Sequence, residues 1–182
     1  MPANMKAMIA ETFFSMARGK SMDKITVTDL VERCKISRQT FYYHFKDIMD
    51  VLEWAMEETV GRTLERSLKV GSDQEAMKIF VSMMLENRDF IRHLLHSQHR
   101  EQIERIIVYG VRSYLWKAYQ LRSPRHTISH TDLELMLDFG AYGLSGLMLQ
   151  VGQQEQVDEK RLADQLCRLL TGRLFTALPG KA

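Results

Sequence analysis

The stretch TVTDLVERCKISRQTFYYHFKD, residues 26–47, is the most informative segment of this chain. Near its end, TFYYHF places aromatic and imidazole rings side by side, next to Arg38, Gln39 and Lys46. A buried strand would not carry so many polar groups, and a solvated helix would not carry so many rings. The segment therefore indicates a surface that needs aromatic tips, hydrogen-bonding side chains and positive charge together.

Two short helices separated by a tight turn account for this stretch. Thr26 is a candidate N-cap of the first helix, with Asp29 at the third helical position, a variant of the capping box. Leu30, Val31 and Cys34 have the spacing of a buried face and predict the inner side of this helix.

The second helix begins after the turn KIS, residues 35–37, with Ser37 as its N-cap. Phe41 and Phe45 are four residues apart and predict its buried side. Asp47 is expected to cap a long helix that follows. Two short helices joined by a three-residue turn fit a helix-turn-helix.

The outer face of the second helix predicts DNA recognition. In a helix-turn-helix the second helix enters the major groove with its N-terminal side chains at the base edges. Arg38 can form two hydrogen bonds with guanine and Gln39 can do so with adenine, while Tyr42 offers a ring for thymine methyl groups. Other polar side chains are expected at phosphates or beside them, where they set the register. These are Thr28, Ser37, Thr40, Tyr43, His44 and Lys46.

The segment ITVTDLVERCKISRQTFYYHFKD resembles the DNA-binding domain of the TetR family of bacterial regulators. The likeness extends over about residues 5–60, and its most specific part is the TFYYHF ending. It implies a three-helix DNA-binding domain joined through a long helix to a C-terminal helical bundle. In this family the bundle dimerises through its last two helices and often encloses an inducer. Cys34 and Lys35 depart from the small residues, including glycine, that family members often have before the turn.

Composition and charge agree with a helical DNA-binding protein. Only three prolines occur in 182 residues, and Met and Leu are frequent, which favours long helices. Residues 1–46 hold eight Lys and Arg against four Asp and Glu, whereas the rest of the chain holds seventeen against nineteen. A basic N-terminal part suggests a polyanion site, although a chance imbalance would look the same.

Helical spacing continues to the end of the chain, and no segment shows the sustained alternation of a strand. We expect helices over about residues 5–19, 73–86, 89–97, 100–120, 131–151 and 157–177, with a break at residues 122–130. The predicted fold is all-α. Its N-terminal domain, residues 1–47, would bind DNA, and residues 48–182 would form a regulatory and dimerisation domain.

The last two predicted helices carry a candidate dimer interface. Gly140, Gly143 and Gly146 recur every three residues, and each glycine costs about 0.5–1 kcal/mol against alanine inside a helix. Close approach of a second backbone would explain these glycines, and packing inside one subunit is the alternative. A four-helix contact between two subunits would include them. Its other members are Leu144, Leu147, Leu162, Leu166, Leu169 and Leu170.

Aromatic and methionine side chains could line a pocket for a small apolar or aromatic inducer, although such residues more often fill cores. The candidates are Trp54, Phe80, Met84, Phe90, Tyr109, Trp116, Phe139 and Tyr142. His93, His96 and His99 fan across a helix too widely to hold one metal ion with good geometry. Neither a metal nor another cofactor is therefore predicted.

Other classes of protein find little support. No spacing of Ser, His and acidic residues singles out a nucleophile and its base, so an enzyme is not expected. Cys34 and Cys167 form no CxxC pair and predict small buried hydrophobes in a reducing cytosol. The N-terminus lacks a signal-peptide pattern, and FGAYGLSGLMLQVG is shorter than the about 20 residues that span a bilayer. We therefore expect a cytoplasmic protein that does not enter a membrane.

These patterns predict a sequence-specific DNA-binding regulator of transcription. Its expected form is a homodimeric repressor that binds double-stranded DNA at a palindromic operator and is released by a small-molecule inducer. One alternative is an activator or co-regulator switched by a protein partner. Another is an interaction protein whose basic face binds an acidic protein or a membrane surface.

Overall fold

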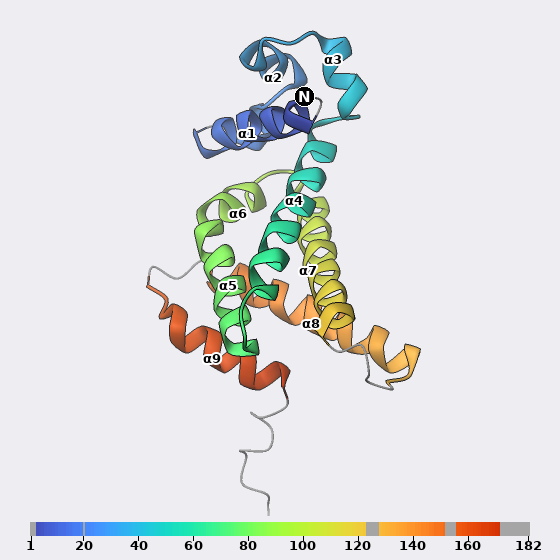
Figure 1. Ribbon diagram of the computed structural model, residues 1–182. Helices are drawn as coiled ribbons and strands as arrows, with labels where there is room; N and C mark the ends of the chain where they lie inside the picture. The colour runs from blue at the N-terminus through green and yellow to red at the C-terminus, as the bar shows by residue number, and fades with distance from the viewer. Residues whose placement is uncertain (1–2, 20, 123–127, 152–155, 172–182) are drawn as a thin grey trace, which may run out of the picture. The chain divides into compact units, whose positions relative to one another are not determined.

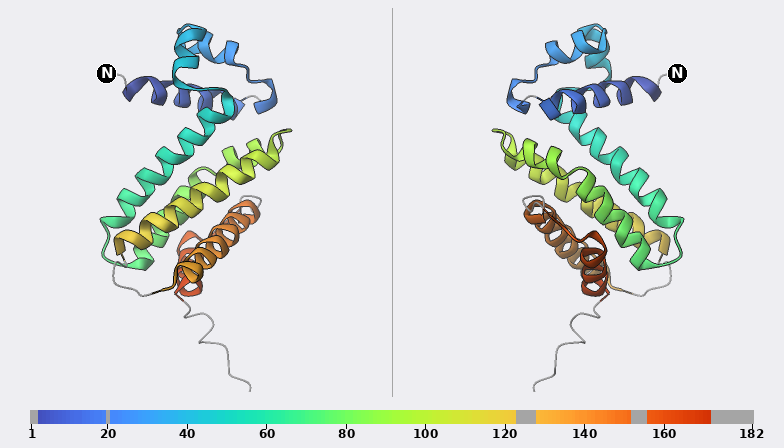
Figure 2. Two further views of the ribbon diagram at one scale, coloured as in Figure 1. Left: turned by 90° about the vertical axis from the view of Figure 1, so that its right-hand side faces the viewer. Right: turned by 90° about the vertical axis from the view of Figure 1, so that its left-hand side faces the viewer.

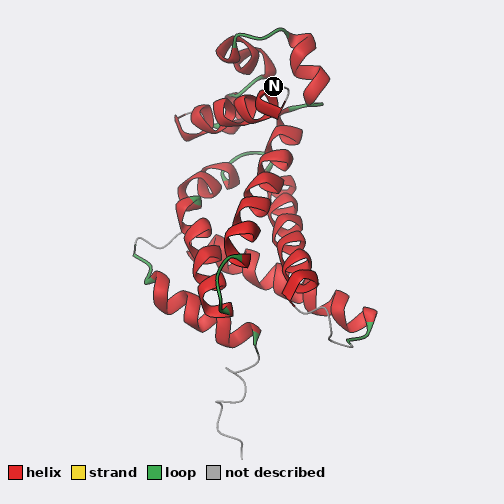
Figure 3. Cartoon of the chain, in the orientation of Figure 1, coloured by secondary structure: helices red, strands yellow, loops and turns green. Residues whose placement is uncertain are grey.

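The computed structural model describes residues 3–19, 21–122, 128–151 and 156–171, and within them the chain is helical and has no strand (Figures 1 and 3). The predicted all-α fold is confirmed. A short 3-10 helix, η1 (Met22–Lys24), precedes α2. The α-helices are α1 (Ala3–Gly19), α2 (Val27–Cys34), α3 (Arg38–His44), α4 (Ile48–Leu68), α5 (Asp73–Glu86), α6 (Arg88–Leu95), α7 (Arg100–Arg122), α8 (His130–Val151) and α9 (Glu159–Leu170).

The chain divides into two compact units. The first unit comprises residues 1–59 and 89–110, and so holds α1, α2, α3, most of α6 and the first parts of α4 and α7. The second unit comprises residues 60–88 and 111–182, with the rest of α4 and α7 and with α5, α8 and α9. The sequence-based boundary after residue 47 separated two predicted roles, DNA binding and regulation. The division by contacts falls elsewhere, and the assignment of those roles stays a prediction.

Buried apolar side chains hold the helix-turn-helix together in the first unit. Ile9 and Phe13 of α1, Leu30 of α2, Phe41 of α3 and Phe45 just after α3 are almost entirely buried. Figure 2 shows α1, α2 and α3 gathered around the first turns of α4. Full burial of such a side chain contributes about 1.5–3 kcal/mol, so this core fixes the orientation of α3.

Side-chain caps determine where α2, α3 and α4 begin. Thr26 Oγ1 accepts from the Asp29 N–H at 3.1 Å, and the Asp29 carboxylate accepts from the Thr26 N–H at 2.9 Å. This is the predicted capping box. Ser37 Oγ accepts from the Thr40 N–H at 3.0 Å, and the Asp47 carboxylate caps α4 in the same way at 2.9 Å. The three predicted N-caps are therefore confirmed.

The turn between α2 and α3 depends on a left-handed residue. Lys35 has φ 55° and ψ 42°, and no other non-glycine residue in the described part of the chain has a positive φ. The Lys35 N–H bonds the Glu32 carbonyl at 3.2 Å, and the Ile36 N–H bonds the Val31 carbonyl at 3.0 Å. Because a Cβ crowds the backbone in this conformation, a lysine costs about 1–2 kcal/mol here relative to its ordinary helical conformation. Glycine would relieve that crowding.

Lys35→Gly is therefore expected to stabilise the chain, with a gain in the free energy of unfolding of about 1 kcal/mol. Urea unfolding followed by circular dichroism measures the change. Lys117→Gly is the matched control, because Lys117 is exposed inside α7 and should lose stability when it becomes glycine. A loss of stability at Lys35 as well would show that the left-handed conformation is not a source of strain.

The second unit has its own core around an aromatic pair. The rings of Phe80 in α5 and Tyr114 in α7 lie 5.2 Å apart, and Tyr114 Oη donates to Ser67 Oγ in α4 at 2.9 Å. α9 packs along α5, where Gln74 Nε2 donates to an Asp164 carboxylate oxygen at 3.1 Å. These contacts join α4, α5, α7 and α9 into one body.

Arg112 links α7 to α8 at the surface of the second unit. Its Nε donates to an Asp138 carboxylate oxygen at 2.6 Å, and its Nη2 donates to Glu134. The hydrogen bond with Asp138 and the two nearby negative charges raise the pKa of the Arg112 guanidinium, against a smaller opposing effect of burial. A partly exposed ion pair contributes little stability, so its main effect is to fix the crossing of these helices.

The described helix boundaries agree with the predicted ones to within a few residues. Residues 123–127 of the predicted break and residues 172–177 of the last predicted helix lie outside the described part of the chain. Cys34 and Cys167 are both reduced, but they are half-buried, so the prediction of full burial was wrong. No described helix has both the length and the hydropathy that crossing a bilayer requires.

Candidate nucleic-acid interface

α3 presents two faces of opposite character. Phe41 is fully buried, whereas Tyr42 and Tyr43 are 55% and 84% exposed. Arg38 and Gln39 occupy the first turn of the same helix and are also exposed. We call Arg38, Gln39, Tyr42 and Tyr43 the recognition surface. This surface combines a guanidinium group, a carboxamide group and two phenol rings on a helix whose other side packs into the core.

Arg38 is tied to the start of α2. Its guanidinium Nη2 donates a hydrogen bond to the Thr28 hydroxyl, and both groups lie on the outside of the first unit. The sequence suggested a base contact for Arg38 and a phosphate contact for Thr28, and the structure brings the two side chains together. This bond restricts the rotamers of a long side chain, which reduces the entropy lost when the arginine meets a ligand.

Ser37 and Thr40 support the first turn of α3. Their hydroxyl oxygens lie 2.9 Å apart, and the Ser37 oxygen also accepts the Thr40 N–H. Ser37 was predicted to contact DNA, and its hydroxyl is engaged here as the cap of the helix. The pair therefore fixes the helix start from which Arg38 and Gln39 project.

The C-terminal end of α3 adds rings and a positive charge. The Tyr43 and His44 rings lie 5.0 Å apart, edge to face at 85°, and the His44 side chain is half-buried. Lys46 is exposed, and its N–H donates to an Asp50 carboxylate oxygen at 2.8 Å, at the start of α4. All nine predicted DNA-contacting residues thus belong to the first unit, in α2, in α3 and in the turns beside α3.

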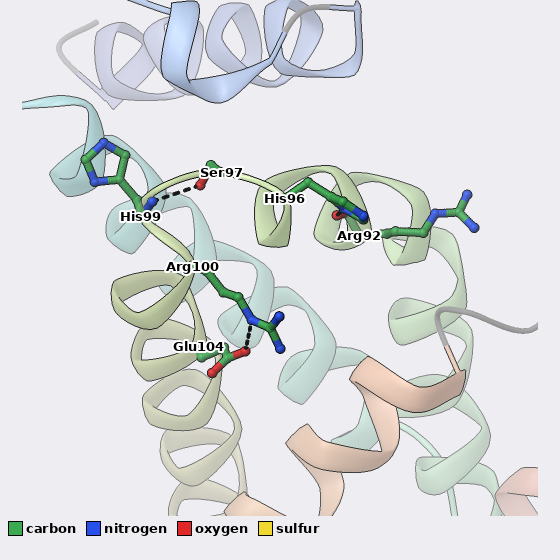
Figure 4. A network of polar contacts seen from close by, with 6 residues as sticks. All are labelled: Arg92, His96, Ser97, His99, Arg100 and Glu104. Atoms are coloured by element: carbon green, nitrogen blue, oxygen red, sulfur yellow. Dashed lines mark hydrogen bonds and ion pairs between the residues drawn. The ribbon is translucent and has the colours of Figure 1, made fainter.

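His93 belongs to α6, and His96 and His99 lie at the α6–α7 corner of the first unit (Figure 4). His96 Nδ1 lies 2.7 Å from the Arg92 carbonyl oxygen, and Ser97 Oγ accepts from the His99 N–H at 3.2 Å. Within residues 3–19, 21–122, 128–151 and 156–171, no three His, Cys, Asp or Glu side chains are grouped to hold a metal ion. The polar contacts at this corner close a turn between two helices.

A contact at this corner was not predicted from the sequence. The Asp23 carboxylate, in η1, accepts from the Gln98 N–H at 3.2 Å. The ring of Phe90 in α6 packs on Phe14 of α1 with centroids 4.6 Å apart. These contacts attach the α6–α7 corner to α1 and η1. No motif marks Asp23 or Gln98, which lie 75 positions apart in the chain, so sequence spacing alone could not pair them.

One face of α8 is apolar and exposed in the second unit. Leu135, Phe139 and Tyr142 are 69%, 72% and 68% exposed. Gly143 and Gly146 continue this line, and a Cβ added at either glycine would meet nothing within 4 Å. We call these five residues the α8 outer face. Their spacing of three and four residues could have identified it, since such residues share one side of a helix.

The rest of the predicted interface divides between the interior and the surface. Gly140 faces inward, where an added Cβ would lie 3.0 Å from Leu115 Cδ1, and Leu144 and Leu166 are buried as well. Leu147, Leu162 and Leu169 are half-buried, and Leu170 is exposed. Each step of three residues shifts the direction of a side chain by about 60° around the helix, so Gly140 and Gly146 point about 120° apart and can face different surroundings. Gly140, Leu144 and Leu166 pack within one chain.

The residues predicted to line an inducer pocket are divided between the two units. Trp54, Phe90 and Tyr109 belong to the first unit, whereas Phe80, Met84, Trp116, Phe139 and Tyr142 belong to the second. Phe80 and Met84 are core residues, while Tyr109, Phe139 and Tyr142 are exposed. Residue type could not separate these environments, since aromatic side chains occupy cores, interfaces and pockets alike.

Comparison with known proteins places this fold among transcriptional regulators. The family model TetR_C_8, described as "Transcriptional regulator C-terminal region", matches residues 73–172. The HTH-type dhaKLM operon transcriptional activator DhaS of Lactococcus lactis is 24% identical over 86 residues, which is 47% of this chain and 46% of that protein. The uncharacterized HTH-type transcriptional regulator YxbF of Bacillus subtilis is 24% identical over 109 residues, 54% of this chain and 28% of that protein. The matches therefore span less than half the length of these relatives.

Solved structures share the fold over nearly the whole chain. The dihydroxyacetone kinase operon activator DhaS has a TM-score of 0.66 at 19% identity, covering 94% of this chain and 96% of that one. A putative TetR-family regulator from Syntrophomonas wolfei has a TM-score of 0.59 at 11% identity and covers 100% of both chains. The regulator FadR from Bacillus subtilis, in complex with stearoyl-CoA, has a TM-score of 0.53 at 14% identity, covering 90% of this chain and 96% of that one.

The family match extends over more than half of this chain, and its relatives are transcriptional regulators and not enzymes. The helix-turn-helix of the first unit and the helical second unit agree with that assignment. The chain belongs to the TetR family of transcriptional regulators.

Proposed function

We propose that this regulator binds a palindromic operator as a homodimer in the cytoplasm and represses transcription until a small ligand releases it. The observation that carries the proposal is the recognition surface, which exposes Arg38, Gln39, Tyr42 and Tyr43 on one side of a helix whose other side is buried. A rigid helix with bidentate donors in its first turn has the chemistry for reading base edges in the major groove.

The contacts on this surface would divide into two kinds. Arg38 and Gln39 would read bases, with Arg38 directed by its bond to Thr28. Tyr43 and Lys46, at the other end of α3, would contact phosphates and so set the register without reading sequence. Loss of a base contact should therefore alter sequence preference, whereas loss of a phosphate contact should weaken binding to every duplex.

The α8 outer face supports the homodimer. It exposes three large apolar side chains and two glycines in one line, and contiguous apolar surface of this kind marks interaction sites. Glycines on an exposed helix face allow a second helix to approach closely. A two-fold symmetric contact would bring the same face of two chains together, and such a dimer matches the symmetry of a palindromic operator.

Activation of transcription is the second candidate. The DhaS relative of Lactococcus lactis is a transcriptional activator, and this chain resembles it in both sequence and fold. A reporter gene placed behind the selected operator separates the two roles. Repression predicts that deletion of the regulator raises reporter expression, whereas activation predicts that deletion lowers it.

Tyr43→Phe tests the phosphate contact, because it removes one hydroxyl and keeps the ring. We expect about a 1 kcal/mol loss in affinity for operator and random duplex alike, as is typical of one hydrogen bond. The dependence of affinity on salt should stay unchanged, since no charge is lost. Fluorescence anisotropy with labelled duplexes measures both quantities. Tyr109→Phe, another exposed tyrosine, serves as the control, and equal affinities for wild type and Tyr43→Phe would remove Tyr43 from the contact set.

Competition experiments test the proposal against binding to an acidic protein or a membrane surface. A specific regulator should be displaced from a labelled operator by the same unlabelled duplex at concentrations at least about 1,000-fold below those of random duplex. Salt dependence cannot make this distinction, because any polyanion would show it. Equal competition by the operator and by random duplex would contradict sequence-specific binding.

A further inference from the structure

Acidic side chains border the α8 outer face. α8 carries Asp132, Glu134 and Asp138 and contains no lysine or arginine. Asp138 comes three residues after Leu135 and four before Tyr142, so the three side chains lie on neighbouring parts of the helix surface. The Asp138 side chain is 52% exposed. A body that covers the α8 outer face would therefore also remove water from this carboxylate.

Arg112 of α7 supplies the positive charge that α8 lacks. Its Nε donates to an Asp138 carboxylate oxygen at 2.6 Å, and its Nη2 donates to Glu134. The guanidinium is always protonated in proteins, and its planar fork of donors can serve two carboxylates at once. The Asp132 carboxylate has a different donor, the Ser129 hydroxyl, at 2.6 Å. Each of the three acidic side chains of α8 thus has a donor within the same chain.

The effect of Arg112 depends on whether this edge of α8 is in water or covered. In the single chain the three side chains are partly exposed, and water screens the attraction between them, so the ion pairs contribute little stability. Under a partner, an unpaired carboxylate would lose its hydration without compensation, whereas a paired one keeps its hydrogen bonds. A two-fold contact would bring the same edge from each copy, so any such cost would be paid twice.

The arrangement of charges also indicates the kind of partner. A basic partner would need free carboxylates at this edge, but Arg112 already engages two of them. An apolar face whose acidic border is offset from within the chain suits a partner that is apolar too. A second copy of this chain offers such a face, with Leu135, Phe139 and Tyr142 exposed on it.

We propose that Arg112 determines self-association: by holding Glu134 and Asp138 it offsets the charge at the edge of the α8 outer face, and so allows two copies to bury that face against each other. The inference rests on the homodimer proposed above. It adds a requirement for a positive charge on α7, which a dimer held only by apolar contacts would not have.

Sedimentation equilibrium of the full chain without DNA tests the role of Arg112. Arg112→Met keeps an apolar stem and removes the guanidinium, so the dissociation constant of the dimer should rise at least about tenfold. Adding Glu134→Gln and Asp138→Asn to the same chain removes the two carboxylates. The triple variant should then return to within about threefold of the wild-type value, because the effects of charges that act on each other do not add.

Two further variants separate charge from shape. Arg105→Met removes another arginine of α7, whose partner Glu101 lies on the same helix in the first unit, and it should leave the dimer unchanged. Arg112→Lys keeps the positive charge, so most of the association should remain. Circular dichroism during urea unfolding shows whether each variant is folded.

The outcomes distinguish this inference from the homodimer itself. A folded Arg112→Met protein that associates as tightly as wild type would overturn the role of Arg112 and leave the homodimer intact. A loss that the two amide substitutions do not restore would show that Arg112 acts by fixing the crossing of α7 and α8, and would overturn the charge mechanism. If Arg112→Met does not fold, loss of the dimer in a folded Arg112→Lys protein would overturn it equally. A monomeric wild type would contradict the homodimer, and this inference with it.

Discussion

Arg38→Ala is expected to lower affinity for the selected operator by about 1–3 kcal/mol and to relax the sequence preference at one base pair in each half-site. The guanidinium projects from the exposed first turn of α3, and its hydrogen bond to the Thr28 hydroxyl holds it there. A bidentate contact from such a group distinguishes guanine from the other bases. Affinity for random duplex should fall much less, so the ratio of specific to non-specific binding is the quantity that reports base reading.

Lys46→Ala is the matched control for Arg38→Ala, because it removes a positive charge at the other end of α3. It should weaken binding to operator and random duplex equally. The slope of log affinity against log salt concentration should also become shallower by about 1, because one phosphate contact is lost. Anisotropy titrations at several salt concentrations measure both effects. If Arg38→Ala behaves in the same way as Lys46→Ala, then Arg38 contacts phosphate, and base reading belongs to Gln39 and Tyr42.

The Thr28–Arg38 bond gives this prediction a second readout. Thr28→Val keeps the shape of the side chain and removes the hydroxyl that accepts from Arg38. If the bond positions the arginine for a base contact, the losses in operator affinity from Thr28→Val and Arg38→Ala will not add in the double variant. Additive losses would show that Thr28 contacts a phosphate independently, as the sequence first suggested.

Gly143→Leu is expected to convert the dimer into a monomer and to abolish palindrome binding at the same time. Gly143 lies on the α8 outer face, and a Cβ added there would meet no atom of the described residues within 4 Å. Folding of the single chain should therefore be unaffected. In a symmetric contact the change occurs twice, and overpacking costs about 1–3 kcal/mol for each residue added. A single chain would retain only half of the base contacts.

Sedimentation equilibrium and operator binding on the same samples measure this effect. Gly61→Leu is the matched control, since Gly61 is also an exposed helical glycine with nothing within 4 Å of an added Cβ, and it lies in α4. It should leave both the molecular mass and DNA affinity unchanged. A Gly143→Leu protein that remains dimeric would contradict the α8 outer face as the interface, and a monomeric wild type would contradict the homodimer itself.

Local sequence patterns predicted the helix-turn-helix of the first unit well. Thr26, Ser37 and Asp47 cap helices because each can satisfy free backbone N–H groups within three residues, and this depends only on nearby sequence. Phe41 and Phe45 are buried because helical spacing places them on one side. The sequence also showed that Lys35 stands near the position where family members often have glycine. Its left-handed conformation, with φ 55°, and the energetic cost of that conformation could be known only from the structure.

The second unit was predicted less completely, because its features depend on contacts between distant helices. Gly140 and Gly143 are equivalent in the sequence, yet one faces Leu115 and the other faces open space. Phe139 and Phe80 are both aromatic, yet one is exposed and the other is buried against Tyr114. Residue type cannot decide between these environments, since the rotation of each helix is set by its neighbours. The hydrogen bond between Tyr114 of α7 and Ser67 of α4 likewise joins two helices that no sequence motif connects.

Selection of bound sequences from a pool of random duplexes measures whether α3 reads sequence within a dimer. The wild-type protein is expected to enrich one inverted repeat, with half-site centres about 34–36 Å apart or a multiple of that distance. Arg38→Ala should select a repeat with one relaxed position in each half, and Gly143→Leu should select no repeat. Failure of the wild type to enrich any sequence over random duplex, or the same repeat selected by all three proteins, would contradict sequence reading by α3 in a dimer.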